Sequence, residues 1–142
     1  MPLAVTGRDR RTGDGSVKRA GRSGSDGIDG EHTREVPMAH FVLPDIASTV
    51  EIQAGAVVSR VIFRDSQTEV TVFGFAAGEG LSEHQASRAA IVQVLKGRLE
   101  LIADGERLDA EPGFWLHMEP GTPHGLTARE PTIMLLTLVG AG

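Results

Sequence analysis

From Phe41 onward the chain consists of short runs rich in β-branched and aromatic residues, which turn-forming residues interrupt every 8 to 12 positions. Residues 56–64 and 68–76 are two such runs, with three polar residues between them. No stretch of this part of the chain repeats its apolar residues with the period of a helix for long enough to predict a helix instead. Many short strands with regularly spaced turns are typical of β-sandwiches and β-barrels. We therefore predict an all-β fold.

The later strands are predicted in the same way. Their expected positions are 89–95, 98–103, 106–109, 114–118 and 132–139. The dipeptide Asp104-Gly105 indicates a two-residue hairpin, because a type I′ turn needs positive φ at both positions. In the run 68–76 both alternating sets of side chains are mostly apolar. We therefore expect that strand to be covered on both sides of its sheet.

The N-terminal part has a different composition from the rest of the chain. Residues 1–38 hold seven glycines and no aromatic residue, so they cannot bury enough apolar surface to offset the entropy of ordering. We predict a disordered, Gly- and Arg-rich tail over 1–38 and a single β-barrel domain over 39–142. An alternative is that the tail is not translated and that the domain starts at Met38.

Composition excludes several classes of protein. The chain has no cysteine, which excludes disulfides, thiolate metal sites and cysteine nucleophiles. No apolar run approaches the ~18 residues that span a bilayer, and the start lacks the hydrophobic stretch of a secretory signal. Residues 37–142 carry 7 basic and 13 acidic side chains, a net charge of −6 that argues against nucleic-acid binding. We expect a cytoplasmic protein with no membrane or nucleic-acid partner.

Two glycine-framed motifs carry most of the functional information. The first runs from Gly78 to Gly97 and contains His84, and the second runs from Gly113 to His124. We expect each histidine to end an extended segment. Serine nucleophiles in a strand-turn-helix setting and glycine-rich phosphate loops are both missing. The chemistry of the chain is therefore expected to depend on these two imidazoles.

The spacing of the motifs resembles that of the cupin superfamily, in particular small single-domain barrels of the cupin 2 type. The family pattern is Gly, five residues, His-x-His, three or four residues, Glu, six residues, Gly, followed by Gly, five residues, Pro-x-Gly, two residues, His, three residues, Asn. The residues that match are Gly78, His84, Gly97, Gly113, Gly121 and His124. The resemblance implies an antiparallel jelly-roll barrel, or double-stranded β-helix, that forms a homodimer.

The first motif is degenerate. In the family, its two His and its Glu, together with the His of the second motif, hold a divalent metal. Here Ala86 replaces the second His and Ala90 replaces the Glu, so half of the usual ligand set is absent. In the second motif Glu119 stands where Pro is usual, and Ala128 stands where Asn is usual.

The resemblance implies that His84 and His124 converge inside the barrel, where neutral imidazole is a suitable ligand for Zn, Fe, Mn or Ni. A metal site usually needs a third protein ligand. His117 and Glu119 are candidates, and Glu79 and Glu83 are weaker ones. The alternatives are that His117 is a packed or interface histidine and that the glutamates are solvated loop residues.

The two alanines also support the opposite interpretation. Without the ligand side chains, Ala86 and Ala90 would leave a larger cavity. The residues expected to line this pocket are Ala86, Ala90, Val92, Val94 and Leu116. Such a pocket would bind a small organic molecule, with the two histidines as its polar groups. The alternative is that these side chains simply fill the barrel as core.

Two classes of function follow. The first is a barrel that binds a small molecule without catalysis, as a sensor or carrier, with a divalent metal held by His84 and His124 as one way of holding the ligand. The second is a metal-dependent enzyme of the oxygenase or isomerase type. The number of remaining ligands favours the first class. We also expect a homodimer, because the strands carry more apolar surface than one small barrel needs.

Overall fold

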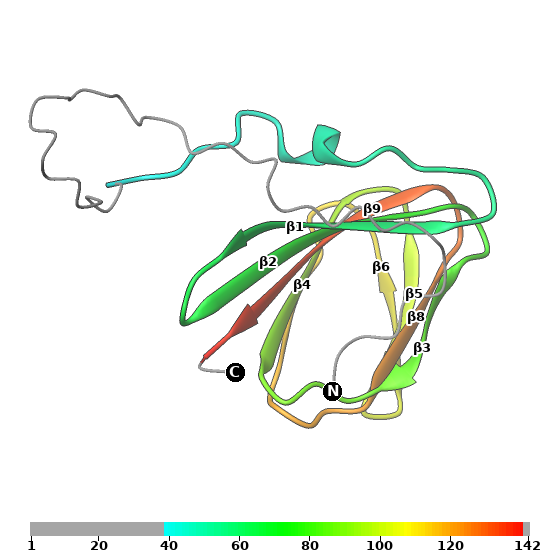
Figure 1. Ribbon diagram of the computed structural model, residues 1–142. Coiled ribbons are helices and arrows are strands. Elements are labelled where there is room, and N and C mark those ends of the chain that lie inside the picture. Colours follow the sequence, from blue (N-terminus) through cyan, green and yellow to red (C-terminus); the bar gives the residue numbers. More distant parts are fainter. Residues whose placement is uncertain (1–38, 141–142) are drawn as a thin grey trace, which may run out of the picture.

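The computed structural model describes residues 39–140, and the tail predicted over 1–38 lies outside this range. The described part contains one short 3-10 helix and nine strands (Figure 1). In chain order they are η3 (Ile46–Thr49), β1 (Val57–Arg64), β2 (Thr68–Phe75), β3 (Gly80–His84), β4 (Ala89–Lys96), β5 (Leu99–Ala103), β6 (Glu106–Ala110), β7 (Trp115–Met118), β8 (His124–Ala128) and β9 (Thr132–Val139). No helix among these residues is long and apolar enough to cross a membrane.

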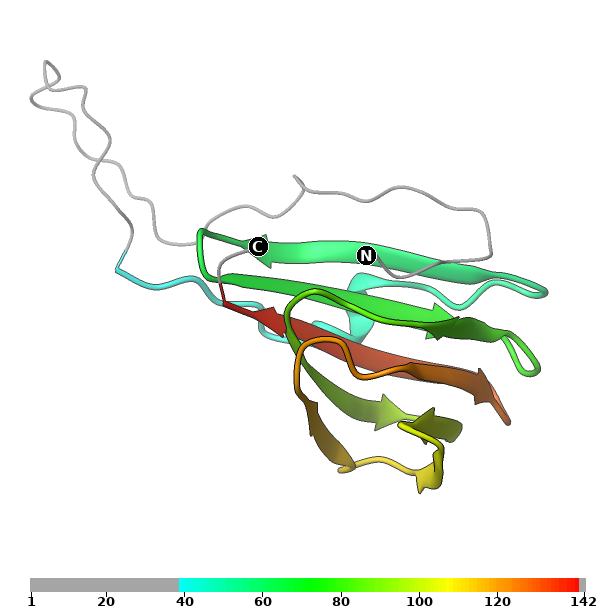
Figure 2. The same ribbon diagram turned by 90° about the horizontal axis from the view of Figure 1, so that it is seen from below.

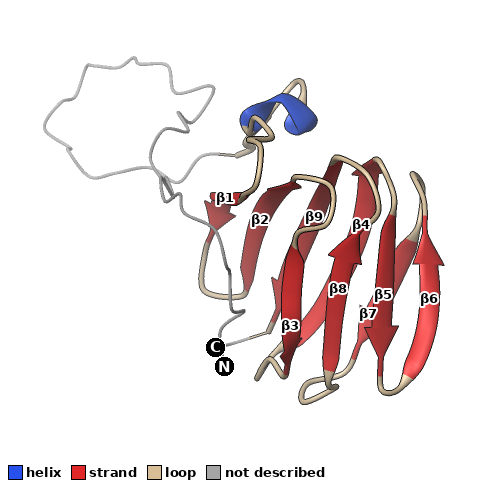
Figure 3. Cartoon of the chain, turned by 90° about the vertical axis from the view of Figure 1, so that its right-hand side faces the viewer, coloured by secondary structure: helices blue, strands red, loops and turns tan. Residues whose placement is uncertain are grey.

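The strands form two antiparallel sheets that face each other. The larger sheet has the order β1-β2-β9-β4-β7, and the smaller sheet has the order β3-β8-β5-β6. Figure 3 shows the smaller sheet in front of the larger one, with the chain passing between them. This arrangement confirms the predicted all-β jelly-roll barrel. The strands expected from the sequence pattern are present within one residue or two at each end.

The turns behave as the sequence predicts. Asp104 and Gly105 both have positive φ, 51° and 84°, as the hairpin between β5 and β6 requires. Gly97, which closes the first motif, has φ 90°, and a Cβ there would lie 2.3 Å from the carbonyl oxygen of Pro131. The motif glycine is therefore needed both for its backbone conformation and for a close approach of two chain segments.

Side chains from both sheets meet in one apolar core. On the inward face of the larger sheet the strand register defines rows across the barrel. One row consists of Phe73, Met134 and Val94, which are all buried. We call this end of the barrel the base. Two rows away, Glu69, Leu138 and Ala90 form the last row, and we call that end the mouth.

Short loops show which end of the smaller sheet lies next to the mouth of the larger sheet. The loop 85–88 leads from the end of β3 to the start of β4, and the loop 119–123 leads from the end of β7 to the start of β8. His84 and His124 therefore lie at the same end as the Glu69 row. This mouth is the lower end of the barrel in Figure 3.

Over β1 and β2, the outer face of the larger sheet is covered by the segment that precedes β1. Figures 1 and 2 show this segment running over β1 and β2, and Figure 2 shows β1, β2 and β9 side by side. Val72 and Ile133 on this face are buried, with Ile46 and Ile52 among the residues packed against them. Strand β2 is thus covered on both sides, which confirms the prediction from its two apolar faces.

Candidate functional site

The two motif histidines lie side by side at the mouth. His84 ends β3, and His124 begins β8, where the register pairs the two residues directly. Their ring centroids are 4.3 Å apart and the rings are tilted by 59°. The expectation that both histidines end extended segments holds for His84 but is wrong for His124, which starts its strand after the turn at 120–123.

A β-bulge turns His84 toward its partner. Between the pairs Leu81–Leu126 and His84–His124, β3 advances by three residues while β8 advances by two. Without the extra residue, alternation would place Glu83 opposite His124. Gly125 makes room for the bulge, because a Cβ at Gly125 would lie 3.1 Å from the backbone nitrogen of Glu83.

Hydrogen bonds fix which nitrogen of each ring is free. The Nδ1 of His84 lies 2.7 Å from the carbonyl oxygen of Ser82, and the Nδ1 of His124 lies 2.8 Å from that of Thr122. A carbonyl oxygen can only accept, so each Nδ1 carries the proton and donates it. In the neutral ring Nε2 is then the acceptor. The Nε2 of His84 is buried and has no hydrogen-bond partner.

The surroundings of His124 favour its neutral form. Only 5% of this residue is exposed, and burial lowers the pKa of its imidazole below the usual value, with a smaller contribution from His84 in the same direction. The hydrogen bond to the carbonyl of Thr122 and the carboxylate of Glu83 oppose this shift without cancelling it. At pH 7 His124 is therefore a neutral acceptor, suited to a ligand's hydrogen-bond donor or to a metal ion.

The loops that carry the pair are fixed to each other. The backbone nitrogen of Gly121, where φ is 85°, donates to the carbonyl oxygen of Ala86 at 2.8 Å. The hydroxyl of Thr122 donates to the carbonyl oxygen of Glu119 at 2.8 Å. A pocket of about 820 Å³ lies where these loops meet. It is lined by Glu83, His84, Gln85, Ala86, Ser87, Pro120, Gly121 and Pro123.

The other predicted ligands do not join the pair. His117 is exposed and pairs with Ile91 on the outer face of the larger sheet, where its ring lies 6.4 Å from that of Trp115. Glu119 is exposed in the turn after β7, and its carbonyl oxygen accepts the turn's hydrogen bonds. Within residues 39–140 no group of three or more His, Asp or Glu side chains could hold a metal ion. The usual four-ligand metal site of the resembled family does not fit the residues present.

The five predicted pocket residues separate into two groups. Ala86 lines the pocket beside His84. Ala90, Val92 and Val94 are each 2% exposed within the apolar core, and Leu116 packs against them. These four follow the alternative interpretation, in which aliphatic side chains fill the barrel as core. The pocket therefore lies at the mouth and not deep in the barrel.

Two charged residues at the mouth were missed by sequence reasoning. The Nη1 of Arg88 lies 3.9 Å from Oε1 of Glu69, and both side chains are largely buried, with 16% of Arg88 and 25% of Glu69 exposed. The Nη1 of Arg88 is buried and has no hydrogen-bond partner. Alternation could have found both residues, because Arg88 is two positions before inward-facing Ala90 and Glu69 is four before Phe73.

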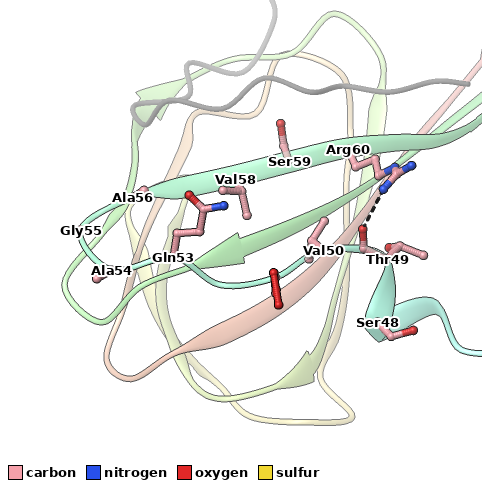
Figure 4. Close-up of a pocket in the computed structure, with 11 residues that line it drawn as sticks. Ser48, Thr49, Val50, Gln53, Ala54, Gly55, Ala56, Val58, Ser59 and Arg60 are labelled. Atoms are coloured by element: carbon pink, nitrogen blue, oxygen red, sulfur yellow. Dashed lines mark hydrogen bonds between the residues drawn. The ribbon is translucent and has the colours of Figure 1, made fainter. Parts of the chain in front are cut away.

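A second depression lies outside the barrel. It has a volume of about 670 Å³ and is lined by residues of β1 and of the segment 48–56 (Figure 4). Arg60 reaches across it, and its Nη1 donates to the carbonyl oxygen of Thr49 at 3.3 Å. The lining contains no histidine and few charged groups. The depression therefore lacks the acceptor pair that marks the mouth.

The fold and the site together define a small double-sheet barrel with a pair of histidines at one end. The family model described as a cupin domain matches residues 71–140, which include both motifs. The chain belongs to the cupin superfamily, as the spacing of its motifs predicts.

Solved structures with the same fold support this assignment. A conserved protein of unknown function from Streptococcus pyogenes is 28% identical, with a TM-score of 0.66 over 74% of this chain and 92% of the other. A cupin superfamily protein from Desulfitobacterium hafniense is 23% identical, with a TM-score of 0.64 over 73% and 94%. A cupin 2 conserved barrel domain protein from Leptotrichia buccalis is 33% identical, with a TM-score of 0.63 over 66% and 45%. No curated protein matches the chain.

Proposed function

We propose that the barrel binds a small organic molecule at its mouth and that His84 and His124 contact this ligand through Nε2. Cupin barrels in general support small-molecule binding or metal-dependent functions. The observation that carries the proposal is the buried Nε2 of His84, which has no hydrogen-bond partner beside the neutral ring of His124. A buried acceptor without a partner costs free energy, and a ligand that donates to it removes that cost.

A divalent metal is the second candidate for what the pair holds. Both Nδ1 atoms donate to carbonyl oxygens, which leaves both Nε2 lone pairs free, as in metal-bound histidines. Two imidazoles are one ligand short of the three that catalytic sites usually supply. A metal here would need further donors from water or from the organic ligand. This shortage favours ligand binding over the metal-dependent oxygenase or isomerase alternative.

The test combines a binding screen with elemental analysis. The native protein is screened against a library of small organic fragments by ligand-observed NMR. Each fragment that binds is then titrated into three variants, His84→Ala, His124→Gln and His117→Ala. We expect affinity to fall in the first two variants and to stay unchanged in His117→Ala, which is the matched control on the outer face.

Metal content separates the two candidates. Protein purified without chelators is analysed for Zn, Fe, Mn and Ni and then titrated with each ion. Stoichiometric metal that is lost in both His84→Ala and His124→Gln would favour the metal-dependent alternative. Fragment binding by metal-free protein supports the proposal, and the absence of any fragment whose affinity depends on the pair would refute it.

We also propose that two copies of the chain associate. Trp115 is 58% exposed on β7, which is an edge strand of the larger sheet, and Ile91 and His117 lie on the same outer face. An edge strand with an exposed aromatic side chain is suited to pairing with the same strand of a second copy. Sedimentation should give a dimer at micromolar concentration and a monomer for Trp115→Ser. A native monomer would contradict the proposal.

A further inference from the structure

We propose that the ligand of the mouth carries a carboxylate and that Arg88 binds this group. The inference rests on the proposed function, since it adds the chemical class of the ligand to the same site. Two buried polar atoms of the described residues have no hydrogen-bond partner, and they are Nε2 of His84 and Nη1 of Arg88. Arg88 follows His84 by four residues, and the three residues between them line the mouth pocket, which Arg88 itself borders in sequence.

The direction of the Arg88 side chain follows from its contacts. Glu69 lies on the inward face of β2, because alternation places it with Thr71, Phe73 and Phe75, and the last two are part of the core inside the barrel. Arg88 Nη1 lies 3.9 Å from Glu69 Oε1, beyond hydrogen-bond distance. The guanidinium is therefore held near the inward face by charge attraction while its Nη1 donors stay free.

The charge of the cluster selects a monoanion. Glu69 also attracts Arg64, whose Nε lies 3.5 Å from the same carboxylate oxygen. Arg64, Arg88 and Glu69 together carry a charge of +1, which the carboxylate of Glu83 in the pocket lining lowers further. The Nη1 of Arg88 has no hydrogen-bond partner, and a planar guanidinium suits a carboxylate. A phosphate dianion is expected to need more positive charge than the cluster provides.

The two free atoms also describe the rest of the ligand. Arg88 offers N–H donors, whereas Nε2 of His84 is an acceptor because Nδ1 donates to Ser82. A molecule that satisfies both carries a carboxylate and a hydroxyl or amine hydrogen. Small hydroxy acids and amino acids have this combination. Neutral sugars and apolar molecules lack the carboxylate.

The experiment uses matched pairs of small carboxylic acids and their primary amides, with and without a hydroxyl group, titrated into the full chain at constant ionic strength. NMR or calorimetry gives the affinities, and inorganic phosphate is titrated as a separate probe. We expect the acids to bind and the amides to bind at least about 10-fold more weakly. Arg88→Gln should weaken acid binding by about 10- to 100-fold, and Arg88→Lys should weaken it less.

Two further variants change the charge of the cluster in opposite directions. Glu69→Gln frees Arg88 from its competing carboxylate, so acids should bind more tightly than to the native protein. Arg64→Gln is the matched control, since 60% of its side chain is exposed and it contacts Glu69 from the other side. It should change acid affinity by less than Arg88→Gln. Circular dichroism and urea denaturation check that each variant folds.

The outcomes separate this inference from the proposed function. Equal binding of acids and amides, tighter binding of phosphate, or acid binding that is unchanged in Arg88→Gln would overturn the role of Arg88, while a dependence on His84 would keep the proposed function. Acid binding that depends on Arg88 but not on His84 or His124 would support the carboxylate site and refute the role of the histidine pair. No acid binding at all would refute the inference.

Discussion

The base and the mouth of the barrel are built by the same strands but have opposite chemistry. At the base, Phe73, Met134 and Val94 face inward and are almost fully buried. Two rows away, β2 carries Glu69, and Arg88, just before β4, lies 3.9 Å from its carboxylate. The smaller sheet changes in the same direction, from the fully buried Leu99 at the base end of β5 to the histidine pair at the mouth.

From this difference we expect stability and the proposed binding to be separated along the barrel axis. The base is packed without free polar groups, so its residues contribute mainly to the hydrophobic free energy of folding. The mouth keeps two buried polar atoms without partners, which lowers stability and suits a ligand. Substitutions at the base should therefore change stability, and substitutions at the mouth should change binding.

The largest effect is expected at the base. Phe75 is fully buried and stacks on Phe73 with ring centroids 5.7 Å apart. Phe75→Ala should lower the free energy of unfolding by about 3 to 5 kcal/mol, because it leaves a cavity in the core. Urea denaturation measures this loss. Ile102→Ala is the control, because Ile102 is 40% exposed. Similar losses in the two variants would show that the base is not tightly packed.

The next effect is expected at the mouth. His84→Ala should weaken the binding of any fragment that occupies the site by about 10-fold or more, because the substitution removes the Nε2 acceptor. Its free energy of unfolding should change by less than about 1 kcal/mol, since the residue is only partly buried and makes one hydrogen bond. A large loss of stability with unchanged binding would reverse the assignment of the two ends.

Restoring a family ligand gives a smaller gain. Ala86→His adds a third imidazole beside His84, at the position that the cupin pattern gives to a histidine. We expect tighter Ni or Zn binding than in the native protein, measured by competition with a chelating dye. Ser87→His, one residue further along the same loop, is the matched control. Equal metal affinity in both variants would show that Ala86 does not point toward the pair.

The smallest effect concerns pH. Burial lowers the pKa of His124 in the folded state, so between that pKa and the unfolded value of about 6.5 the unfolded chain binds more protons. Stability should therefore fall as the pH drops below about 6.5 and should level off below the folded pKa. Urea midpoints between pH 8 and pH 5 measure this slope. His124→Gln should have a smaller slope, and an identical slope would exclude His124 as its source.

The sequence predicted the base better than the mouth. Alternation and turn residues set the strands, so the inward positions of Val92 and Val94 follow from local pattern alone. The motif spacing predicted that His84 and His124 meet. Their rings meet because of a bulge in β3. No sequence pattern predicts this extra residue, because the bulge requires only the space that Gly125 leaves beside it.

The charged residues of the mouth were missed for a different reason. Arg88 precedes β4 in the loop, and Glu69 lies close to the start of β2, so each looks like a solvated residue at a strand end. Their proximity depends on β9 lying between β2 and β4, which is a long-range pairing. His117 was a candidate ligand that the structure places on the outer face. Strand alternation alone could not decide which face of β7 points inward.

The most direct test of the account follows the imidazole nitrogens by long-range 1H–15N NMR while a fragment that binds is added to the native protein. The account predicts protonated Nδ1 and unprotonated Nε2 in both rings at pH 7.5, with the Nε2 signals of His84 and His124 moving together as the site fills. The signals of His117 should stay in place. A fragment that moves His117, or that leaves both Nε2 signals unchanged at saturation, would contradict the central claim that the histidine pair binds the ligand.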